Sequence, residues 1–201
     1  MTLLERESTE GLQAEGLPVA RKAVLKTARL TLRAPRPDDA KAIKALINDR
    51  RVAENMASIP HPYTLKDARS FIANAAGKPL FVITRDDGQV IGGCGGSYRG
   101  DHPELGYWLG VPYWGNGYAT ETARALVDYC FGELGYDEIL AGARVTNPAS
   151  RRVLEKCGFQ WTGVKLQRVV ALNSSAPSDR FRLDRGLWDS LRNWGKVELI
   201  D

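Results

Sequence analysis

Ligands for metal ions and partners for disulfide bonds are scarce in this chain. Its 201 residues include two histidines and three cysteines. The thiols of Cys94, Cys130 and Cys157 stand in apolar or glycine-rich surroundings, and no metal-ligand spacing links them to His61 or His102. This pattern excludes a disulfide scaffold and points to no metal site. We therefore expect three buried thiols in a reducing compartment.

Long apolar runs and a strong charge of one sign are also missing. No run approaches the roughly 20 apolar residues that span a membrane, and the N-terminus has no apolar signal core. The net charge is +4, and the basic residues are dispersed along the chain. Such a balance suits an anionic small ligand and does not indicate nucleic-acid binding. We expect a cytoplasmic protein that binds neither membranes nor nucleic acids.

The sequence predicts one domain preceded by a short extension. Hydrophobic residues make up 43% of the chain, which is enough for a sizeable core in a single domain. Residues 1–22 lack hydrophobic periodicity, and we interpret them as a mobile extension or an arm that docks on a partner. Residues 23–201 then form the single domain.

Local signals place several elements along the chain. The alternation in Leu30–Arg33 predicts a strand, and the apolar spacing in Pro37–Asp49 predicts a helix. Thr64 and Asp67 form a capping pair at the start of a further helix. Residues 173–178, which include three serines and a proline, predict a loop between the last two strands.

The most informative segment is Gly110–Glu121, which joins a strand-like run, Glu104–Leu109, to a helix-like run that ends near Leu134. Gly115 and Gly117 let the backbone turn tightly and let an anion approach without a Cβ in the way. The first turn of the helix adds unpaired N–H donors. The segment therefore predicts a phosphate or pyrophosphate site, and a plain glycine-rich turn is the alternative.

Two familiar phosphate loops do not match this segment. A Walker-type loop ends in Gly-Lys-Ser/Thr, whereas Gly117 is followed by Tyr118 and Ala119. A dinucleotide fingerprint needs a third glycine and an acidic residue after the next strand, and both are missing here.

A second segment, Asn147–Phe159, predicts a short helix with both ends marked. Asn147 is a good N-cap, and Pro148 suits the first helical position. Gly158 stands where the end of a helix favours a left-handed residue. Capping alone would explain Asn147, so a functional role for it is an alternative rather than a necessity.

In this order and spacing, the segments resemble the Gcn5-related N-acetyltransferase (GNAT) superfamily, and within it the branch that acetylates the N-termini of ribosomal proteins. The resemblance runs from about Leu30 to Trp188. It rests on four pieces, Leu30–Arg33 followed by Pro37–Ala40, Glu104–Leu109, Tyr113–Glu121, and Asn147–Phe159. It implies an α/β (α+β) fold with a mixed, mostly antiparallel seven-stranded sheet flanked by helices. Two parallel strands, at 104–109 and 138–145, should splay at their C-terminal ends.

The resemblance implies an acetyl-CoA-dependent N-acetyltransferase, that is, an acyltransferase with acetyl-CoA as co-substrate and no metal. The acceptor is then a primary amine, with a protein N-terminal α-amine as the favoured case and a small-molecule amine as the alternative. A regulatory module that binds acyl-CoA without turnover is a second alternative. Homodimer formation is left open.

The resemblance also assigns roles to residues. Glu104 is the candidate base that deprotonates the amine, although a solvated glutamate at a strand edge is the alternative. Ser150 is the candidate acid beside the leaving thiolate. The cofactor is assigned to the end of the strand, the two-glycine loop and the start of the short helix: Leu109, Val111, Trp114, Gly115, Asn116, Gly117, Tyr118, Ala119, Thr120, Asn147, Ser150 and Arg151.

Two positions depart from the superfamily pattern. Pro112 stands where a Gln or Arg usually donates to the pyrophosphate, so backbone N–H groups must carry that contact. Leu154 stands where many members have a tyrosine acid, so Ser150 or unassisted departure of the thiolate must serve. The acceptor should enter between residues 52–63 and 168–178, in what we expect to be an open groove.

Overall fold

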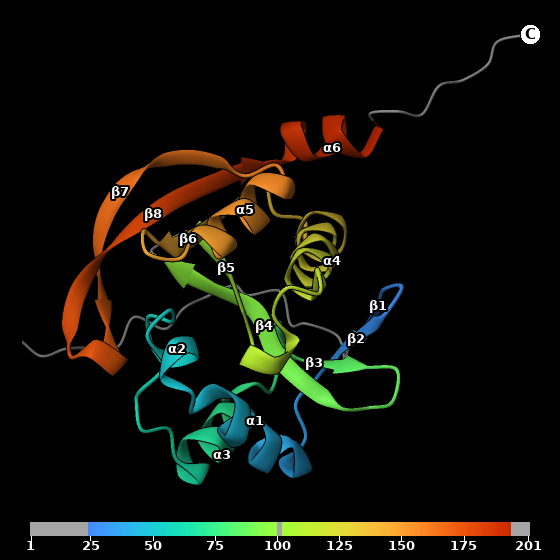
Figure 1. The fold of residues 1–201 in the computed structure, drawn as a ribbon. Coiled ribbons are helices and arrows are strands. Elements are labelled where there is room, and N and C mark those ends of the chain that lie inside the picture. The colour runs from blue at the N-terminus through green and yellow to red at the C-terminus, as the bar shows by residue number, and fades with distance from the viewer. Residues whose placement is uncertain (1–23, 100–101, 194–201) are drawn as a thin grey trace, which may run out of the picture.

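The computed structural model describes residues 24–99 and 102–193, so the predicted extension at residues 1–22 lies outside the described residues. The fold is built on one sheet with the strand order β1-β2-β3-β4-β5-β6-β8-β7 (Figure 1). Its strands are β1 Leu25–Lys26, β2 Leu30–Arg33, β3 Leu80–Arg85, β4 Val90–Arg99, β5 His102–Leu109, β6 Glu138–Arg144, β7 Gln160–Val169 and β8 Ser174–Asp184. The helices are α1 Ala40–Ile47, α2 Arg50–Ala53, α3 Leu65–Asn74, α4 Tyr118–Gly132, α5 Pro148–Lys156 and α6 Arg185–Asn193, with short 3-10 turns η1 Pro37–Asp39, η2 Val111–Tyr113 and η3 Val170–Leu172.

The sheet has eight strands where seven were predicted. The additional strand is β1, a two-residue segment that pairs with β2 through Leu25 opposite Leu32. So short a strand leaves no alternating pattern in the sequence. The mixed, mostly antiparallel architecture flanked by helices is otherwise confirmed, with β5 and β6 as the parallel pair among the described strands.

The predicted splay of the two parallel strands is confirmed. Strands β5 and β6 are paired at two positions, Glu104 opposite Leu140 and Leu105 opposite Ala141. Beyond Leu105 the two strands no longer pair, although β5 continues to Leu109 and β6 to Arg144. The sheet therefore opens at its centre, and we call this opening the β5–β6 gap.

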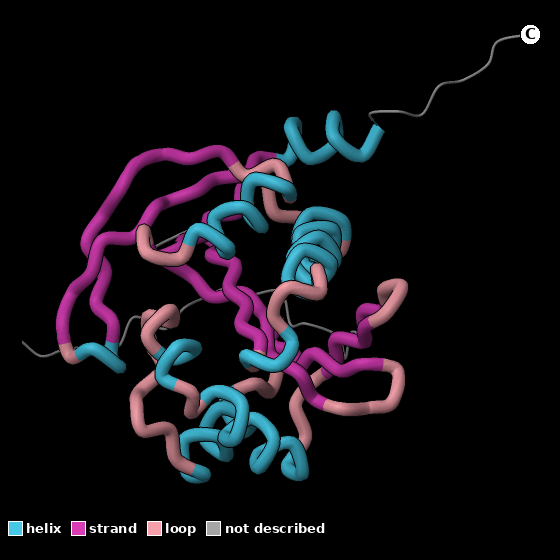
Figure 2. Tube along the Cα trace, viewed as in Figure 1, coloured by secondary structure: helices cyan, strands magenta, loops and turns pink. Residues whose placement is uncertain are grey.

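Helices cover both faces of the sheet and bury a separate core on each (Figure 2). On one face, α4 and α5 pack over odd-numbered positions of β5 and β6 such as Leu105 and Ala141. Apolar residues of α4, among them Ala123 and Leu126, are fully buried there. On the other face, α1 and α3 pack over Val82 and Trp108. Successive strand residues thus point into different cores.

The polar segment 173–178 is not the predicted loop. Ser174 begins β8, which pairs with β7 from Ser174 opposite Val169 to Arg182 opposite Gln160. The chain reverses instead through η3 and Asn173, which has a left-handed φ of 48°. Composition was misleading because pairing between neighbouring strands overrides weak local preferences. Strands β7 and β8 form a long hairpin that curves away from the rest of the sheet (Figure 1).

Most local end signals hold in the structure. Thr64 and Asp67 form a reciprocal capping box at the start of α3. The predicted helix over 37–49 is divided into η1 and α1 and ends at Ile47. Asp49 has left the helical conformation, and it caps α2 by accepting from the Arg51 N–H at 2.9 Å. The described helices include none that is both long and apolar enough to cross a bilayer.

Candidate active site

The two-glycine loop adopts the conformation that its glycines predict. Gly115 and Gly117 both have φ of 79°, in the left-handed region that other residues avoid. Gly117 is the N-cap of α4, and no side chain caps that helix end. The Glu121 N–H donates to the Gly117 carbonyl at 3.1 Å, so the three preceding N–H groups of the helix have no intrahelical acceptor. These donors, together with the helix dipole, form a site suited to an anion.

The space around the loop leaves room for such an anion. A Cβ added at Gly115 would meet nothing within 4 Å, and one at Gly117 would meet only Arg29 Nη2 at 3.4 Å. A cavity of about 630 Å³ opens beside the loop between β1 and α4. Its lining carries both signs of charge, with Lys26, Arg29 and Arg124 beside Glu121, Asp128 and Glu133. Arg29 is the cation next to Gly117.

Arg29 holds the loop in place from the turn between β1 and β2. Its Nη1 donates to the Asn116 carbonyl at 3.0 Å, and its Nε donates to Glu121 at 2.8 Å. Its guanidinium also lies over the Tyr118 ring, 4.7 Å from the centroid. Thr27 adds a hydrogen bond of 2.6 Å to the same Glu121 carboxylate. Sequence reasoning missed Arg29 because it lies 92 residues before the glutamate that it contacts.

The backbone of Leu109 faces the β5–β6 gap. The Gly110 N–H donates to Ile91 of β4 at 2.9 Å, and hydrogen-bonded positions alternate along an antiparallel pair. The Leu109 N–H and carbonyl therefore point away from β4, toward the strand from which β5 has separated. The carbonyl accepts from the Trp114 indole N–H at 2.8 Å, which fixes that half-exposed ring against the strand end.

Ser150 is brought to the same gap by the start of α5. Asn147 caps this helix as predicted, with its Oδ1 accepting from the Ser150 N–H at 3.1 Å. The Ser150 Oγ lies 2.9 Å from the hydroxyl oxygen of Tyr107 on β5. Burial raises the pKa of the Tyr107 hydroxyl above its ordinary value, and the hydrogen bond with Ser150 opposes this rise. Tyr107 therefore stays neutral at physiological pH.

Tyr107 was not among the predicted site residues. Strand alternation offered a signal, because Tyr107 shares a face with Leu105 and Leu109 and so points toward α5. Arg151, which was predicted to bind the cofactor, contacts two carboxylates. Its Nε donates to Glu155 at 2.9 Å, and its Nη1 lies 3.7 Å from Asp179.

Glu104 occupies the opposite face of the sheet, in contact with two arginines. Its Oε1 accepts from Arg180 Nη2 at 2.7 Å, and its Oε2 accepts from Arg99 Nε at 2.8 Å. The glutamate side chain is 16% exposed and that of Arg180 is 9% exposed. Glu104 is therefore a fixed, half-enclosed carboxylate rather than a freely solvated one. The sequence did not predict either contact between Glu104 and an arginine.

The cysteines are buried as expected. Cys94, Cys130 and Cys157 are free thiols inside the core. Burial raises the pKa of Cys130 to about 12 and that of Cys157 to about 11. These thiols are thus poor nucleophiles at neutral pH. Within residues 24–99 and 102–193, no three His, Cys, Asp or Glu side chains gather where they could hold a metal ion.

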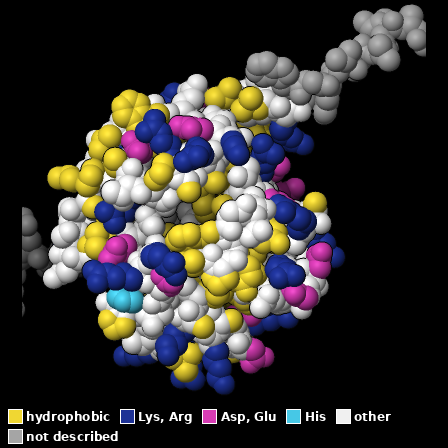
Figure 3. Space-filling model, in the orientation of Figure 1, with side chains coloured by type: hydrophobic (Ala, Val, Ile, Leu, Met, Phe, Trp, Pro, Cys, Tyr) yellow, Lys and Arg dark blue, Asp and Glu magenta, His cyan; other side chains and the backbone are white. Residues whose placement is uncertain are grey.

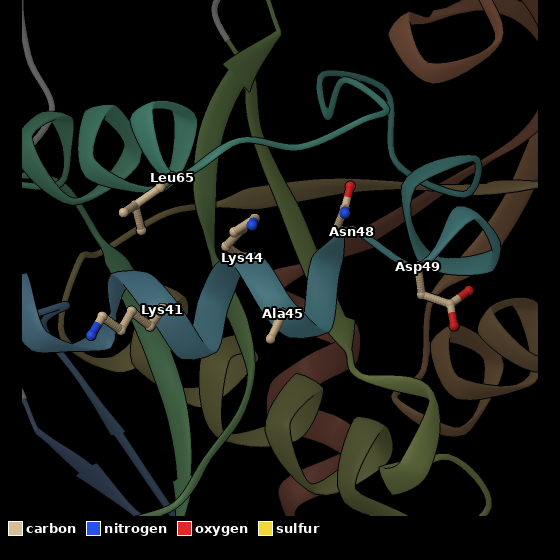
Figure 4. Close-up of a pocket in the computed structure, with 6 residues that line it drawn as sticks. All are labelled: Lys41, Lys44, Ala45, Asn48, Asp49 and Leu65. Carbon is tan, nitrogen blue, oxygen red and sulfur yellow. The ribbon is translucent and has the colours of Figure 1, made fainter.

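A second cavity of about 510 Å³ lies away from the predicted site, along the exposed side of α1. Lys41 and Lys44 of α1 and Asn48 at its C-terminal end border it, with Leu65 of α3 facing them (Figure 4). None of the predicted cofactor or catalytic residues lines it, whereas Gly117 and Thr120 line the cavity beside the two-glycine loop.

Comparison with known proteins agrees with this geometry. Residues 29–160 match the family model described as "Acetyltransferase (GNAT) domain". The chain is 33% identical over 153 residues to the uncharacterized N-acetyltransferase YoaA of Bacillus subtilis, an alignment that covers 72% of this chain and 86% of the relative. A GNAT acetyltransferase structure from Bacillus anthracis superposes with a TM-score of 0.72 at 25% identity, covering 81% of this chain and 98% of that one. Spermidine N-acetyltransferase from Vibrio cholerae, in complex with CoA and spermine, gives a TM-score of 0.69 at 21% identity, with 81% and 99% coverage. The chain therefore belongs to the GNAT family and is an acetyl-CoA-dependent N-acetyltransferase.

Proposed function

We propose that this enzyme acetylates a primary amine that reaches the β5–β6 gap from the face of Glu104, while acetyl-CoA occupies the face of α4 and α5. The observation that carries the proposal is the division of groups across the gap. The anion site and Ser150 lie on one face, and the Glu104 carboxylate lies on the other. Acetyl-CoA supplies an activated acyl group for this reaction.

The chain's own residues divide the remaining work. The N–H groups at the start of α4 bind the pyrophosphate. Pro112 cannot supply the Gln or Arg donor that is usual at its position, and Arg29 and Arg124 lie nearby in its place. The Leu109 N–H, which points into the gap, is the donor for the developing oxyanion. Asn147, Val111 and the rest of the two-glycine loop guide the chain of the cofactor toward that donor.

Glu104 takes a proton from the ammonium form of the acceptor, directly or through a water, so that the free amine can attack the thioester. A carboxylate has about four acceptor positions on its two oxygens, so the two arginine contacts leave room for the amine. Ser150 donates a hydrogen bond to the leaving sulfur. The neutral Tyr107 hydroxyl can donate to Ser150 Oγ, which leaves the serine proton free to face the sulfur.

The space available to the acceptor distinguishes a small-molecule amine from a peptide. The resemblance to the ribosomal-protein branch favours a peptide α-amine and an open groove. However, the two expected walls touch, because the Val170 N–H of η3 donates to the Ala57 carbonyl after α2 at 3.0 Å. This hydrogen bond bridges the groove from wall to wall. It supports the small-molecule amine over a long peptide.

The test is thiol release from acetyl-CoA across a panel of amines, including peptide N-termini, free amino acids, polyamines and aminoglycosides. We expect amine-dependent release, with turnover of at least one small amine above that of any peptide. Acetyl-CoA binding without amine-dependent release from any member of the panel would contradict the proposed activity.

A further inference from the structure

The floor of the acceptor side is exposed sheet backbone between charged side chains. Gly106 of β5 and Gly142 of β6 each follow the last position at which these two strands pair, on the face of Glu104, and both are exposed in central strands. A Cβ at Gly106 would meet nothing within 4 Å. Figure 3 shows a hollow in the surface between the β7–β8 hairpin and the helices that face it. We call this the acceptor hollow.

Side chains on three strands bring guanidinium groups to the acceptor hollow. Arg180 of β8 is paired with Gly142 and extends across it, since a Cβ on Gly142 would lie 2.7 Å from Arg180 Nη1. Arg144 follows Gly142 on the same face of β6, and Arg99 reaches Glu104 from β4. Two of these guanidinium groups, those of Arg180 and Arg99, contact the Glu104 carboxylate, and Arg144 lies farther along the same face of β6. The hollow therefore carries an excess of positive charge.

The neighbouring charges do not cancel this excess. Glu138, the next carboxylate on this face of β6, is 3.3 Å from both Arg182 and His102. From the helical side, the Glu54 carboxylate pairs with Arg50 on its own helix. Asp179 points to the opposite face, where it accepts from the Trp161 indole.

Arg144 is the group whose bonding is incomplete. Its Nη1 donates to the Glu54 carbonyl at 2.9 Å, which anchors the guanidinium at the end of α2. Its Nε is buried and has no hydrogen-bond partner among the described residues. A buried donor without an acceptor is unfavourable. Arg144 is therefore the arginine on this face whose hydrogen bonding is still unsatisfied.

We propose that the acceptor is a small zwitterionic amine, one that carries a carboxylate or phosphonate within a few bonds of the amine that is acetylated. This inference rests on the proposed function. The amine faces Glu104, and the anion faces Arg180 and Arg144. Because Glu104 and Arg180 are in direct contact at 2.7 Å, they match an acceptor whose opposite charges are equally close. A polycation would meet three guanidinium groups and one carboxylate, which disfavours it.

The experiment compares kcat/KM for matched acceptors: an α-amino acid, its aminophosphonate analogue, its amide, and spermidine. Rates are corrected for the fraction of free amine, since the carboxylate and the amide shift the amine pKa differently. We expect the two anionic acceptors to exceed the amide by roughly tenfold or more, as one charge-assisted hydrogen bond is worth about 1.5–3 kcal/mol. Arg144→Gln should reduce this ratio toward one. The matched control is Arg182→Gln, on the same face of the neighbouring strand, which should keep the ratio.

Three results would overturn the inference. If the amide or spermidine is acetylated as well as the acid, the enzyme is active but does not select an anion. If Arg144→Gln keeps the full preference while its acetyl-CoA affinity and melting temperature match wild type, Arg144 does not bind the anion. If acetyl-CoA binds but no amine is acetylated, the proposed function fails and this inference fails with it. A second measurement on the wild type needs no variant: the N-acetyl acid should inhibit more strongly than the N-acetyl amide.

Discussion

At the scale of single residues, Glu104 is the most direct test of the chemistry. Glu104→Gln keeps the shape of the side chain and one acceptor oxygen but removes the ability to take a proton. We expect kcat to fall by roughly 10²–10⁴-fold, with acetyl-CoA affinity unchanged, because the anion site lies on the other face of the sheet. Steady-state kinetics and calorimetry measure the two effects separately. A variant that keeps nearly the full rate at every pH would show that another group or solvent takes the proton.

Single residues also show where sequence reasoning succeeds and fails. The left-handed glycines at 115 and 117 and the cap at Asn147 were predictable, because each acts within a few residues of the chain. The partners of Glu104 were not, since Arg180 lies 76 residues away and nothing local marks an arginine that will be buried. The direction of the Leu109 N–H depends on strand pairing, so the side chain at this position does not predict it.

At the scale of elements, the turn between β1 and β2 supports the two-glycine loop. Arg29→Ala removes the contacts to Asn116, Glu121 and Tyr118 at once. We expect acetyl-CoA affinity to fall by roughly tenfold, as charge-assisted hydrogen bonds are worth about 1.5–3 kcal/mol each, with partial recovery in Arg29→Lys. The KM for acetyl-pantetheine, which lacks the pyrophosphate, should change little.

The control for this prediction is Arg85→Ala, since Arg85 is an exposed residue paired with Asp87 at the β3–β4 turn. It should leave both affinities unchanged. An equal loss for acetyl-CoA and acetyl-pantetheine in Arg29→Ala would mean that Arg29 stabilises the fold generally rather than the anion site.

Elements also differ in how far the sequence predicts them. Helices α3 and α5 carry their own end signals, so they were placed well. Strand β1 and the first half of β8 carry none, and their conformation depends on the strands beside them. Strand β1 was missed and the first half of β8 was predicted as a loop for the same physical reason. Pairing between strands is not encoded in the local sequence.

At the scale of the whole molecule, buried acidic groups predict how stability depends on pH. Burial raises the pKa of Cys157 from 9.0 to about 11, that of Cys130 from 9.0 to about 12, and that of Tyr63 from 10.0 to about 12. Between the ordinary and the raised values the folded protein holds protons that the unfolded chain has lost. These groups therefore favour the folded state fully below about pH 9, and this contribution is lost as pH rises from about 9 to about 12.

Urea unfolding midpoints at steps between pH 8 and 11 measure this effect. We expect the midpoint to fall progressively above pH 9, with a shallower fall in Cys157→Ala, which removes one of the contributing groups. A midpoint that stays constant to pH 11, or an identical slope in the variant, would contradict the assignment.

The opening between β5 and β6 has a further consequence for how substrates enter the enzyme and how products leave it. In the proposed arrangement the two substrates arrive from opposite sides of the sheet and meet only in the gap where β5 and β6 have ceased to pair. Neither has to pass the position of the other, and the described cysteines are too deeply buried to carry the acetyl group between them. The acetyl group is then transferred directly from acetyl-CoA to the amine within a complex of the enzyme and both substrates. Afterwards the two products can depart through separate exits, so neither blocks the release of the other.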